Sequence, residues 1–256
     1  MRRRSAGKVI LKTEAQIEQM KEAGCLSARV LRKLGEVIEP GISTLELDAI
    51  AENFIALEGG KPSFKGYGGF PGTICASPNS MVVHGIPSAT CILKEGDILS
   101  VDTGATVNGW VGDNAYTYQV GKVDPEKQML CEVTQEALAA GIAQAVPGNH
   151  MGDIGAAIQR VVEEHGFAVV REYVGHGIGR SMHEPPYVPN YGKKGRGLLL
   201  EEGLVIAIEP MVVAGKRKVH TLGDGWGVVT NDGKPAAHFE KTVAVTADGP
   251  IIITTE

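Results

Sequence analysis

The chain repeats part of its own pattern at a fixed offset, which favours a fold built from two similar halves. Pro40-Gly41 recurs as Pro147-Gly148, and each pair precedes a helix-like stretch that is closed by glycine. Further along, Leu93-Lys94-Glu95-Gly96 recurs as Leu200-Glu201-Glu202-Gly203. By the same offset Asp102 maps onto Glu209, so two carboxylates fall at equivalent points of the two halves.

Within each half the helix signals precede the strand signals, which predicts an α+β domain. Thr13-x-x-Gln16 and Ser43-x-x-Glu46 have the form of capping boxes, and Asp124-Pro125 is an N-cap followed by proline. We expect a basic tail and then a single domain with two half-repeats: residues 1–12 for the tail, 13–256 for the domain, and about 13–120 and 121–256 for the halves.

The strand signals predict a hairpin that carries two of the acids. Asn108-Gly109 is a strong two-residue turn and would join a strand ending at Ala105 to one that begins at Trp110. In that register Asp102 lies opposite Ala115 and Asp113 lies opposite Gly104, roughly 7–8 Å apart on one face. The two aspartates could then share one ion, although a bulge would shift them by a residue.

The composition is that of an ordinary globular protein, with 43% hydrophobic and 21% charged residues among 256. A net charge of −5 argues against specific nucleic-acid binding. Two basic segments, Lys193-Lys194-Gly195-Arg196 and Lys216-Arg217-Lys218, are interpreted as solvated loops. The alternative is that these loops, or the Arg2 to Arg4 tail, contact an anionic partner.

The four cysteines lie far apart without a CxxC pair, which argues against a disulfide framework or zinc finger and favours the cytoplasm. No apolar run approaches membrane-spanning length, so no membrane is expected as a partner.

Four carboxylates lie in apolar, strand-like contexts: Asp102, Asp113, Glu209 and Glu240. A single acid of this kind is best interpreted as a surface charge on a half-exposed strand. Four buried acids, however, would destabilise the fold unless they were paired, and too little Lys or Arg lies nearby. Two divalent cations would cancel the four charges.

His176 follows an apolar strand predicted over Phe167–Val174, and its flanking glycines are expected to let the backbone approach a ligand. His84 has a similar context, and His183 lies a few residues beyond His176. The alternative for an isolated histidine is a satisfied polar residue at a strand end. A site with one nitrogen and many oxygens favours Mn, Co, Fe or Zn in a hydrolytic pair. Three other histidines are expected at the surface: His150, His165 and His220.

Taken together, these segments closely resemble bacterial type I methionine aminopeptidases. The matching stretches cover most of the chain from about Thr13 onward: Val83-His84-Gly85-Ile86-Pro87, Asp102 through Gly112-Asp113, Arg171 through Gly179, Ile208-Glu209-Pro210-Met211 and Phe239-Glu240-Lys241-Thr242. The resemblance implies the pita-bread fold, in which two pseudo-symmetric halves of helices pack on a curved antiparallel sheet.

The resemblance also implies five metal ligands: Asp102, Asp113, His176, Glu209 and Glu240. Asp113 and Glu240 would bridge two divalent ions, and a water between the ions would attack the first peptide bond, with Glu209 taking its proton. His183 and one ion would stabilise the oxyanion, while the substrate amine would bind the other ion. His84 would guide the leaving amide.

By resemblance, four residues line the methionine side-chain pocket: Tyr67, Phe70, Cys75 and Trp226. Each could instead be a core residue, and Cys75 in particular could be an inert buried thiol. Gly68, Asn114 and Phe64 depart from residues common in relatives, which leaves the ligands intact but puts the rim of the pocket and its inhibitor profile in question.

Two other functions compete. An Xaa-Pro aminopeptidase or prolidase has a similar site but usually a substantial extra N-terminal domain, and the segment before His84 is short for one. A catalytically dead pita-bread protein that binds peptides, RNA or protein would normally lack ligands that this chain retains. The segment between His176 and Glu209, numbered 177 through 208, leaves no room for the insertion of type II relatives.

The expected activity is therefore removal of the initiator methionine from nascent proteins whose second residue is small. A monomer is the family default.

Overall fold

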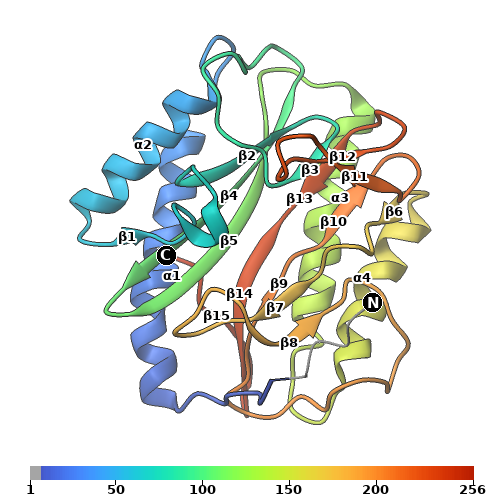
Figure 1. The fold of residues 1–256 in the computed structure, drawn as a ribbon. Coiled ribbons are helices and arrows are strands. Elements are labelled where there is room, and N and C mark those ends of the chain that lie inside the picture. Colours follow the sequence, from blue (N-terminus) through green and yellow to red (C-terminus); the bar gives the residue numbers. More distant parts are fainter. Residues whose placement is uncertain (1–6) are drawn as a thin grey trace.

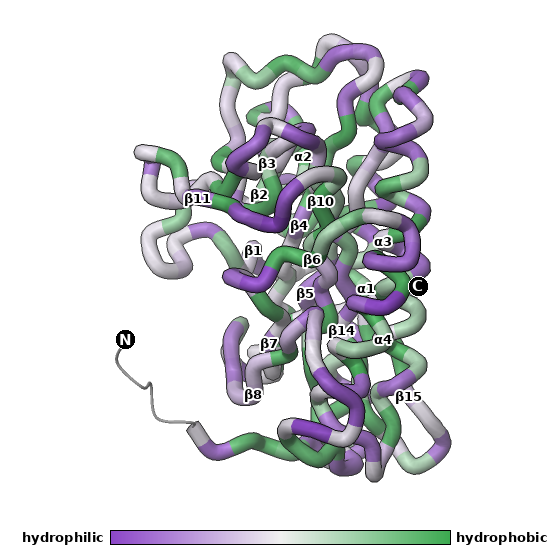
Figure 2. Tube along the Cα trace, turned by 90° about the vertical axis from the view of Figure 1, so that its right-hand side faces the viewer, coloured by the Kyte–Doolittle hydropathy of each residue, from purple (hydrophilic) through white to green (hydrophobic). Residues whose placement is uncertain are grey.

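The computed structural model describes residues 7–256, and the part of the expected tail at residues 1–6 lies outside the described residues. Figure 1 shows the fold. In the view of Figure 2, turned by 90°, the α-helices lie toward one side of the molecule and the small sheets and loops toward the other. The helices are α1 (Glu14–Gly35), α2 (Thr44–Leu57), α3 (Pro125–Ile142) and α4 (Met151–Glu164), with a short 3₁₀ helix at Tyr67–Gly69.

The main sheet has nine strands, in the order β1-β4-β5-β14-β9-β7-β8, with β2 paired to β4 and β15 paired to β14. Each of these strand pairs is antiparallel. The bounds are β1 (Lys61–Pro62), β2 (Ile74–Pro78), β4 (Ile98–Val107), β5 (Trp110–Gln119), β7 (Gly175–Gly177), β8 (Glu184–Val188), β9 (Val205–Ile208), β14 (Glu240–Thr246) and β15 (Gly249–Ile252).

Two three-stranded sheets complete the fold, with the strand orders β13-β10-β6 and β11-β12-β3. Their bounds are β3 (Met81–Val83), β6 (Ala168–Val169), β10 (Met211–Val213), β11 (Val219–Thr221), β12 (Val228–Thr230) and β13 (Ala236–His238). The sheet of β3 and β12 joins the two halves, because β3 belongs to the first and β12 to the second.

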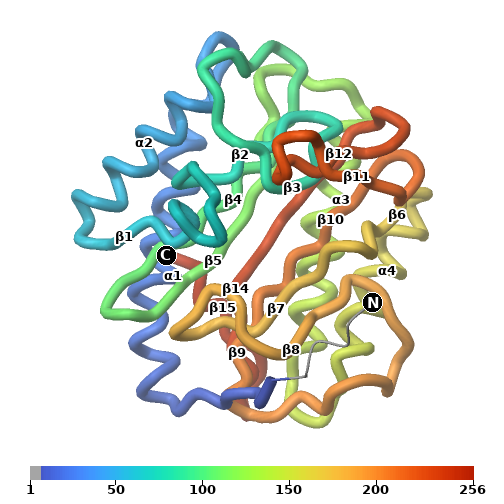
Figure 3. Tube along the Cα trace, viewed as in Figure 1, coloured from blue at the N-terminus to red at the C-terminus, as the bar shows by residue number. Residues whose placement is uncertain are grey.

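The internal repeat is visible in the structure. The offset that carries Pro40 onto Pro147 also carries α2 (Thr44–Leu57) onto α4 (Met151–Glu164) at both ends. The residue before each helix forms the same isolated bridge, Ser43 with Ile92 and His150 with Leu199. Figure 3 shows the two halves side by side, with β14 running between them. The prediction of a pita-bread α+β fold with two similar halves is confirmed.

Each half has its own apolar core between helices and sheet. The first half buries Leu26, Val30 and Leu34 of α1 against Leu99 and Val101 of β4. The second half buries side chains of α3 and α4 against β9 and β14, including Leu130, Ile154, Ile158, Ile206 and Val243. These cores hold the sheet rigid from behind, so its other face can carry polar groups in fixed positions.

The predicted capping signals and the hairpin are confirmed. Thr13 and Ser43 form capping boxes with Gln16 and Glu46, and the Asp124 side chain accepts from the backbone of Lys127. In the hairpin Asp102 lies opposite Ala115 and Asp113 opposite Gly104, with the turn at Asn108 and Gly109, both of which have positive φ.

The strand predicted over Phe167–Val174 is wrong, because the chain bends there and supplies two different sheets. Ala168–Val169 forms β6 and pairs with β10, whereas the main-sheet strand β7 begins only at Gly175. The polar residues Arg171-Glu172-Tyr173 occupy the bend between them.

The boundary expected at residue 12 stays a prediction, but Lys12 itself is tied to the second half. Its backbone N–H donates to Gly203 O at 2.7 Å, and its Nζ lies 2.7 Å from Glu184 Oε2. Both side chains of this ion pair are nearly inaccessible, at 3% and 8% exposure. Within residues 7–256, none of the helices combines the length and apolar character that crossing a bilayer would require.

Candidate metal centre and substrate cavity

The five predicted ligands come from adjacent strands of the main sheet. Asp102 lies on β4 and Asp113 on β5, so the hairpin register sets their separation. Glu240 begins β14, which pairs with β5 on one side and β9 on the other. Glu209 directly follows β9, and His176 is the middle residue of β7, opposite Ala207. Strands from both halves therefore bring the five side chains to one place.

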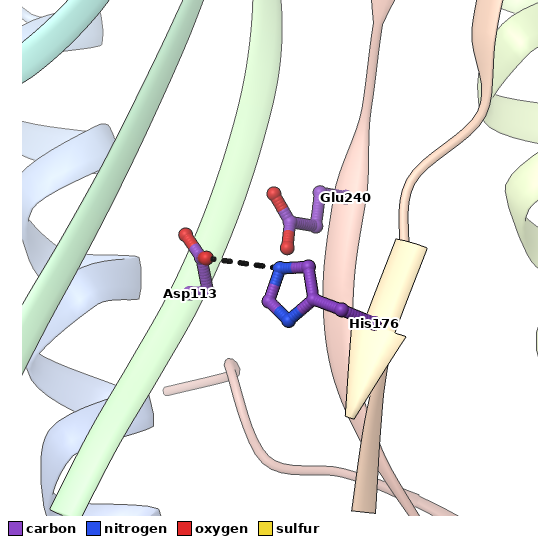
Figure 4. Close-up of side chains that lie close together, drawn as sticks. All are labelled: Asp113, His176 and Glu240. Carbon is purple, nitrogen blue, oxygen red and sulfur yellow. Dashed lines mark ion pairs between the residues drawn. The ribbon is translucent and has the colours of Figure 1, made fainter. Parts of the chain in front are cut away.

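The distances show a compact cluster. His176 Nε2 lies 3.6 Å from Asp113 Oδ2 and 3.8 Å from Glu209 Oε1. Figure 4 shows Asp113 of β5, Glu240 of β14 and His176 of β7 converging, and one ligand atom from each lies within 4.8 Å of the others. A second group with the same property consists of Glu209, His238 and Glu240. Glu240 is common to both groups.

Burial and mutual repulsion dominate the electrostatics of the cluster. Loss of solvent, followed by the charges of Asp113 and Glu209, raises the pKa of Asp102 well above its usual range. The same three causes raise the pKa of Glu240. Burial alone would lower the pKa of His176, but Asp113 and Glu209 raise it overall. The fold thus concentrates negative charge where it is costly, as a cation site does.

The cluster fits divalent metal ions. Within the described part of the chain, three polar atoms of the cluster are buried without a hydrogen-bond partner: Asp102 Oδ1, Glu240 Oε1 and His238 Nε2. Buried polar atoms are normally satisfied, so the two unpartnered carboxylate oxygens, which lie beside other negative charges, indicate a cation site. Carboxylate oxygens with imidazole nitrogen form a donor set suited to Mn, Fe, Co or Zn.

The glycines beside His176 serve a different purpose from the one predicted. A Cβ on Gly175 would collide with the backbone oxygen of Ala207, and one on Gly177 would collide with that of Pro185. Both glycines therefore permit close packing of β7 between β9 and β8, and the approach of a ligand is not what requires them.

His84 and His183 lie at the same cavity as the cluster. His84 has the left-handed backbone angle φ 60°, which is strained for a residue with a side chain, and burial lowers its pKa. The Tyr67 hydroxyl shares a 2.8 Å hydrogen bond with Nδ1 of His183. Although His183 is exposed at the mouth, partial desolvation and then the nearby His176 lower its pKa.

All of the site residues predicted from the sequence line this one cavity, whose volume is about 220 Å³. Its walls are apolar and aromatic, and the ring centroids of Phe70 and Trp226 lie 5.1 Å apart. Ligand pockets for drug-sized molecules occupy ~300–1,000 Å³. The smaller space here suits a single amino-acid side chain above the acidic cluster.

The three residues that depart from the family pattern differ in their position relative to the cavity. Phe64 lines the cavity, and a Cβ on Gly68 would come within 3.5 Å of Trp226. Asn114 points away from the cluster and accepts a 3.1 Å hydrogen bond from Lys241 Nζ. The first two positions therefore bear on the pocket, whereas Asn114 does not line it.

His238 is the residue of the cluster that the sequence did not assign. It is 1% exposed, and its Nε2 lies 3.5 Å from Glu209 Oε2. The available signal was its position two residues before Glu240, because alternate residues of an extended chain share a face. His165 and His220 are exposed as expected, whereas His150 is half-buried at the N-cap of α4.

Comparisons with known proteins identify the family of this chain. The metallopeptidase family M24 matches residues 18–247. The chain belongs to metallopeptidase family M24. Within this M24 family, methionine aminopeptidase 1 of Bacillus subtilis (strain 168) is 52% identical over 246 residues, which is 96% of this chain and 99% of the relative. The predicted resemblance to bacterial methionine aminopeptidases is confirmed, and with it the prediction of a peptide hydrolase.

Solved structures of other proteins have the same fold as this chain. The crystal structure of methionine aminopeptidase from Thermotoga maritima has a TM-score of 0.96 and 44% identity, covering 97% of this chain and all (100%) of that one. The prolidase from Pyrococcus horikoshii OT3 shares the fold at a TM-score of 0.77 and 24% identity, but only 63% of its chain is covered. M24 membership implies that the chain uses a divalent metal; the roles of individual residues remain predictions.

Proposed function

We propose that this chain removes the initiator methionine from nascent proteins whose second residue is small, using two divalent metal ions. One observation carries the proposal: the acidic cluster forms the floor of an apolar cavity with room for one side chain. The proposed ligands are Asp102, Asp113, His176, Glu209 and Glu240.

In this proposal Asp113 and Glu240 would help to hold both ions, because each lies between proposed ligands of the two halves. Bound divalent ions would lower the pKa of a water molecule and polarise the substrate carbonyl. Glu209 is at the less buried edge of the cluster, with a side chain that is 14% exposed, and accepts the proton of the attacking water.

The two histidines would act on the substrate itself. The Tyr67 hydroxyl fixes Nδ1 of His183, which leaves Nε2 to donate a hydrogen bond to the carbonyl oxygen as charge develops on it. His84, held by its strained backbone, guides the leaving amide nitrogen. Phe70, Cys75 and Trp226 would enclose the methionine side chain.

The test is hydrolysis of Met-Ala-Ser by protein that has been stripped of metal and reloaded with Mn, Co, Fe(II) or Zn in turn. We expect release of methionine that depends on added metal, and little release from a peptide with a large second residue. Two results would contradict the proposal: faster turnover of Ala-Pro than of Met-Ala-Ser, or protein that binds none of the four metals under reducing conditions.

The proposed partners are the N-termini of nascent chains in the cytoplasm, met by a monomeric enzyme. The basic loops at 193–196 and 216–218 are exposed and suit a transient contact with the ribosome. Salt-sensitive co-sedimentation with ribosomes, reduced when Lys216, Arg217 and Lys218 are changed to Glu, would support that contact. Equal co-sedimentation of the two proteins would exclude it.

A further inference from the structure

His238 is held rigidly at the end of β13, beside the proposed metal site. Its backbone N–H donates to Thr117 Oγ1 at 2.9 Å, and the Thr117 hydroxyl donates to His238 O at 2.8 Å. Thr117 in turn lies 2.8 Å from the hydroxyl of Ser100 on β4. The backbone of His238 is thereby fixed to the first-half hairpin, although the residue belongs to the second half.

The imidazole of His238 faces the Glu209 carboxylate. Its Nε2 lies 3.5 Å from Glu209 Oε2, while the other carboxylate oxygen, Oε1, lies 3.8 Å from His176 Nε2. Glu209 thus lies between two imidazoles that come from different strands. Among residues 7–256 the buried Nε2 of His238 has no hydrogen-bond partner, and the Glu209 carboxylate is an acceptor that lies close to it.

Glu209 differs from the other three acids in lying outside a strand. It lies just beyond the end of β9 and before Pro210, outside the ladder that fixes Glu240 and Asp113. Its backbone O accepts a 2.9 Å hydrogen bond from Asn190 Nδ2, but among residues 7–256 no hydrogen bond to its carboxylate is found. The side chain of the proposed proton acceptor is therefore positioned by its surroundings and not by its strand.

We propose that His238 is a positioning residue, whose Nε2–H donates to Glu209 Oε2 and holds that carboxylate in the orientation that metal binding requires. This role rests on the proposed metal site. Carboxylate ligands in metalloproteins are commonly oriented by a hydrogen bond from a residue behind them, and loss of that bond typically weakens metal binding about 10–100-fold.

Direct ligation by His238 is the competing arrangement, because Glu209, His238 and Glu240 could also hold an ion together. The two arrangements differ in what a glutamine would do at position 238. The glutamine amide can donate a hydrogen bond to Glu209, but it is a poor substitute for an imidazole ligand.

The experiment measures Mn(II) binding to the metal-free full chain by calorimetry, without substrate, for wild type, His238→Gln and His238→Ala. We expect His238→Gln to bind Mn(II) within about threefold of wild type and His238→Ala to bind about 10–100-fold more weakly. His220→Ala is the matched control, because His220 is exposed and its Nδ1 pairs with Asn231 on the surface.

A double-mutant cycle separates positioning from loss of structure. In a Glu209→Gln background, His238→Ala should produce little further loss of Mn(II) affinity, since its effect runs through Glu209. Unfolding curves of the metal-free variants show whether each is folded. The proposal is overturned if His238→Ala binds Mn(II) like wild type, if His238→Gln is as weak as His238→Ala, or if pulsed EPR of bound Mn(II) shows coordination by a His238 nitrogen.

Failure of the proposed function would look different. If the metal-binding pattern is as expected but Met-Ala-Ser is not hydrolysed, the assignment of His238 stands and the proposed peptidase substrate is wrong. If wild type binds no metal, both are wrong.

Discussion

The two halves of the molecule have equivalent helices, but they differ in how the chain connects the two carboxylates of each half. In the first half only the segment 103–112 separates Asp102 from Asp113, and the Asn108-Gly109 turn joins their strands directly. In the second half the much longer segment 210–239 separates Glu209 from Glu240, although the two strands are again neighbours. The halves are thus similar as scaffolds and different as binding sites.

The long connection in the second half contains strands and cavity residues for which the short hairpin has no room. Residues 210–239 include β10 to β13, the cavity residue Trp226 and the buried His238. They also place β12 against β3 of the first half. A duplicated fold therefore gains an asymmetric pocket by lengthening one connection while the ligand-bearing strands stay paired.

The sharpest test of this comparison changes one proposed bridging acid in each half. We expect Asp113→Asn and Glu240→Gln each to reduce Met-Ala-Ser hydrolysis below detection, because each acid would help to hold both proposed ions. Both variants should remain folded by circular dichroism, since removing a buried charge relieves repulsion in the metal-free protein. Retained turnover in either variant would show that its half does not supply a bridge.

Smaller losses should follow from the histidines, one of which comes from each half. We expect His183→Ala to lower kcat by roughly 10²–10³-fold, the range for loss of one donor to a developing oxyanion. His84→Ala should lower kcat less, because it acts on the leaving amide and not on the charge that forms first. Stopped-time assays with saturating Met-Ala-Ser measure both, and the reverse order would exchange the two assigned roles.

The contact between the N-terminal segment and the second half can be tested through Lys12. Lys12→Met leaves the buried Glu184 without its cation and should lower the free energy of unfolding by roughly 3–5 kcal/mol. Lys21→Met is the matched control, because its pair with Glu18 is exposed, at 42% and 71%. Urea unfolding measures the free energy of unfolding of both variants. Equal values would mean that the buried pair contributes no more to stability than the surface pair.

The smallest expected difference compares two glycines that the repeat makes equivalent. Gly96 and Gly203 both have φ 86°, so alanine at either position should destabilise the fold by about 1–2 kcal/mol. A Cβ at Gly203 would also lie 2.5 Å from Lys12 O, whereas at Gly96 the nearest atom is 3.7 Å away. Gly203→Ala should therefore cost an additional ~1–3 kcal/mol. Equal melting temperatures for the two variants would contradict this asymmetry.

The features that could be predicted from the sequence are those fixed locally or by the repeat. The Asn108-Gly109 turn sets the register of Asp102 and Asp113, and the capping boxes set the starts of α1 and α2. Each depends on residues close together in the chain, so pattern alone identifies them.

The features that were missed depend on packing between distant segments. His238 becomes significant only when β13 lies beside Glu209, and Lys12 only when it meets Glu184, 172 positions further along the chain. The segment 167–174 also bends and divides between two sheets, and the polar residues 171–173 in its middle were the available signal for that break. Hydrophobic periodicity indicates which face of a helix or strand a residue occupies, but it does not indicate which distant segment packs against that face.

Strand β14 has a consequence for how the protein could be divided. It pairs with β5 of the first half and β9 of the second, and it carries Glu240 at the junction. A chain cut in the exposed loop at residues 121–122 would give two fragments, each with an incomplete set of the proposed ligands. Neither fragment should retain a divalent ion through dialysis, whereas the mixed fragments should recover it, so metal retention would serve as a direct measure of fragment complementation.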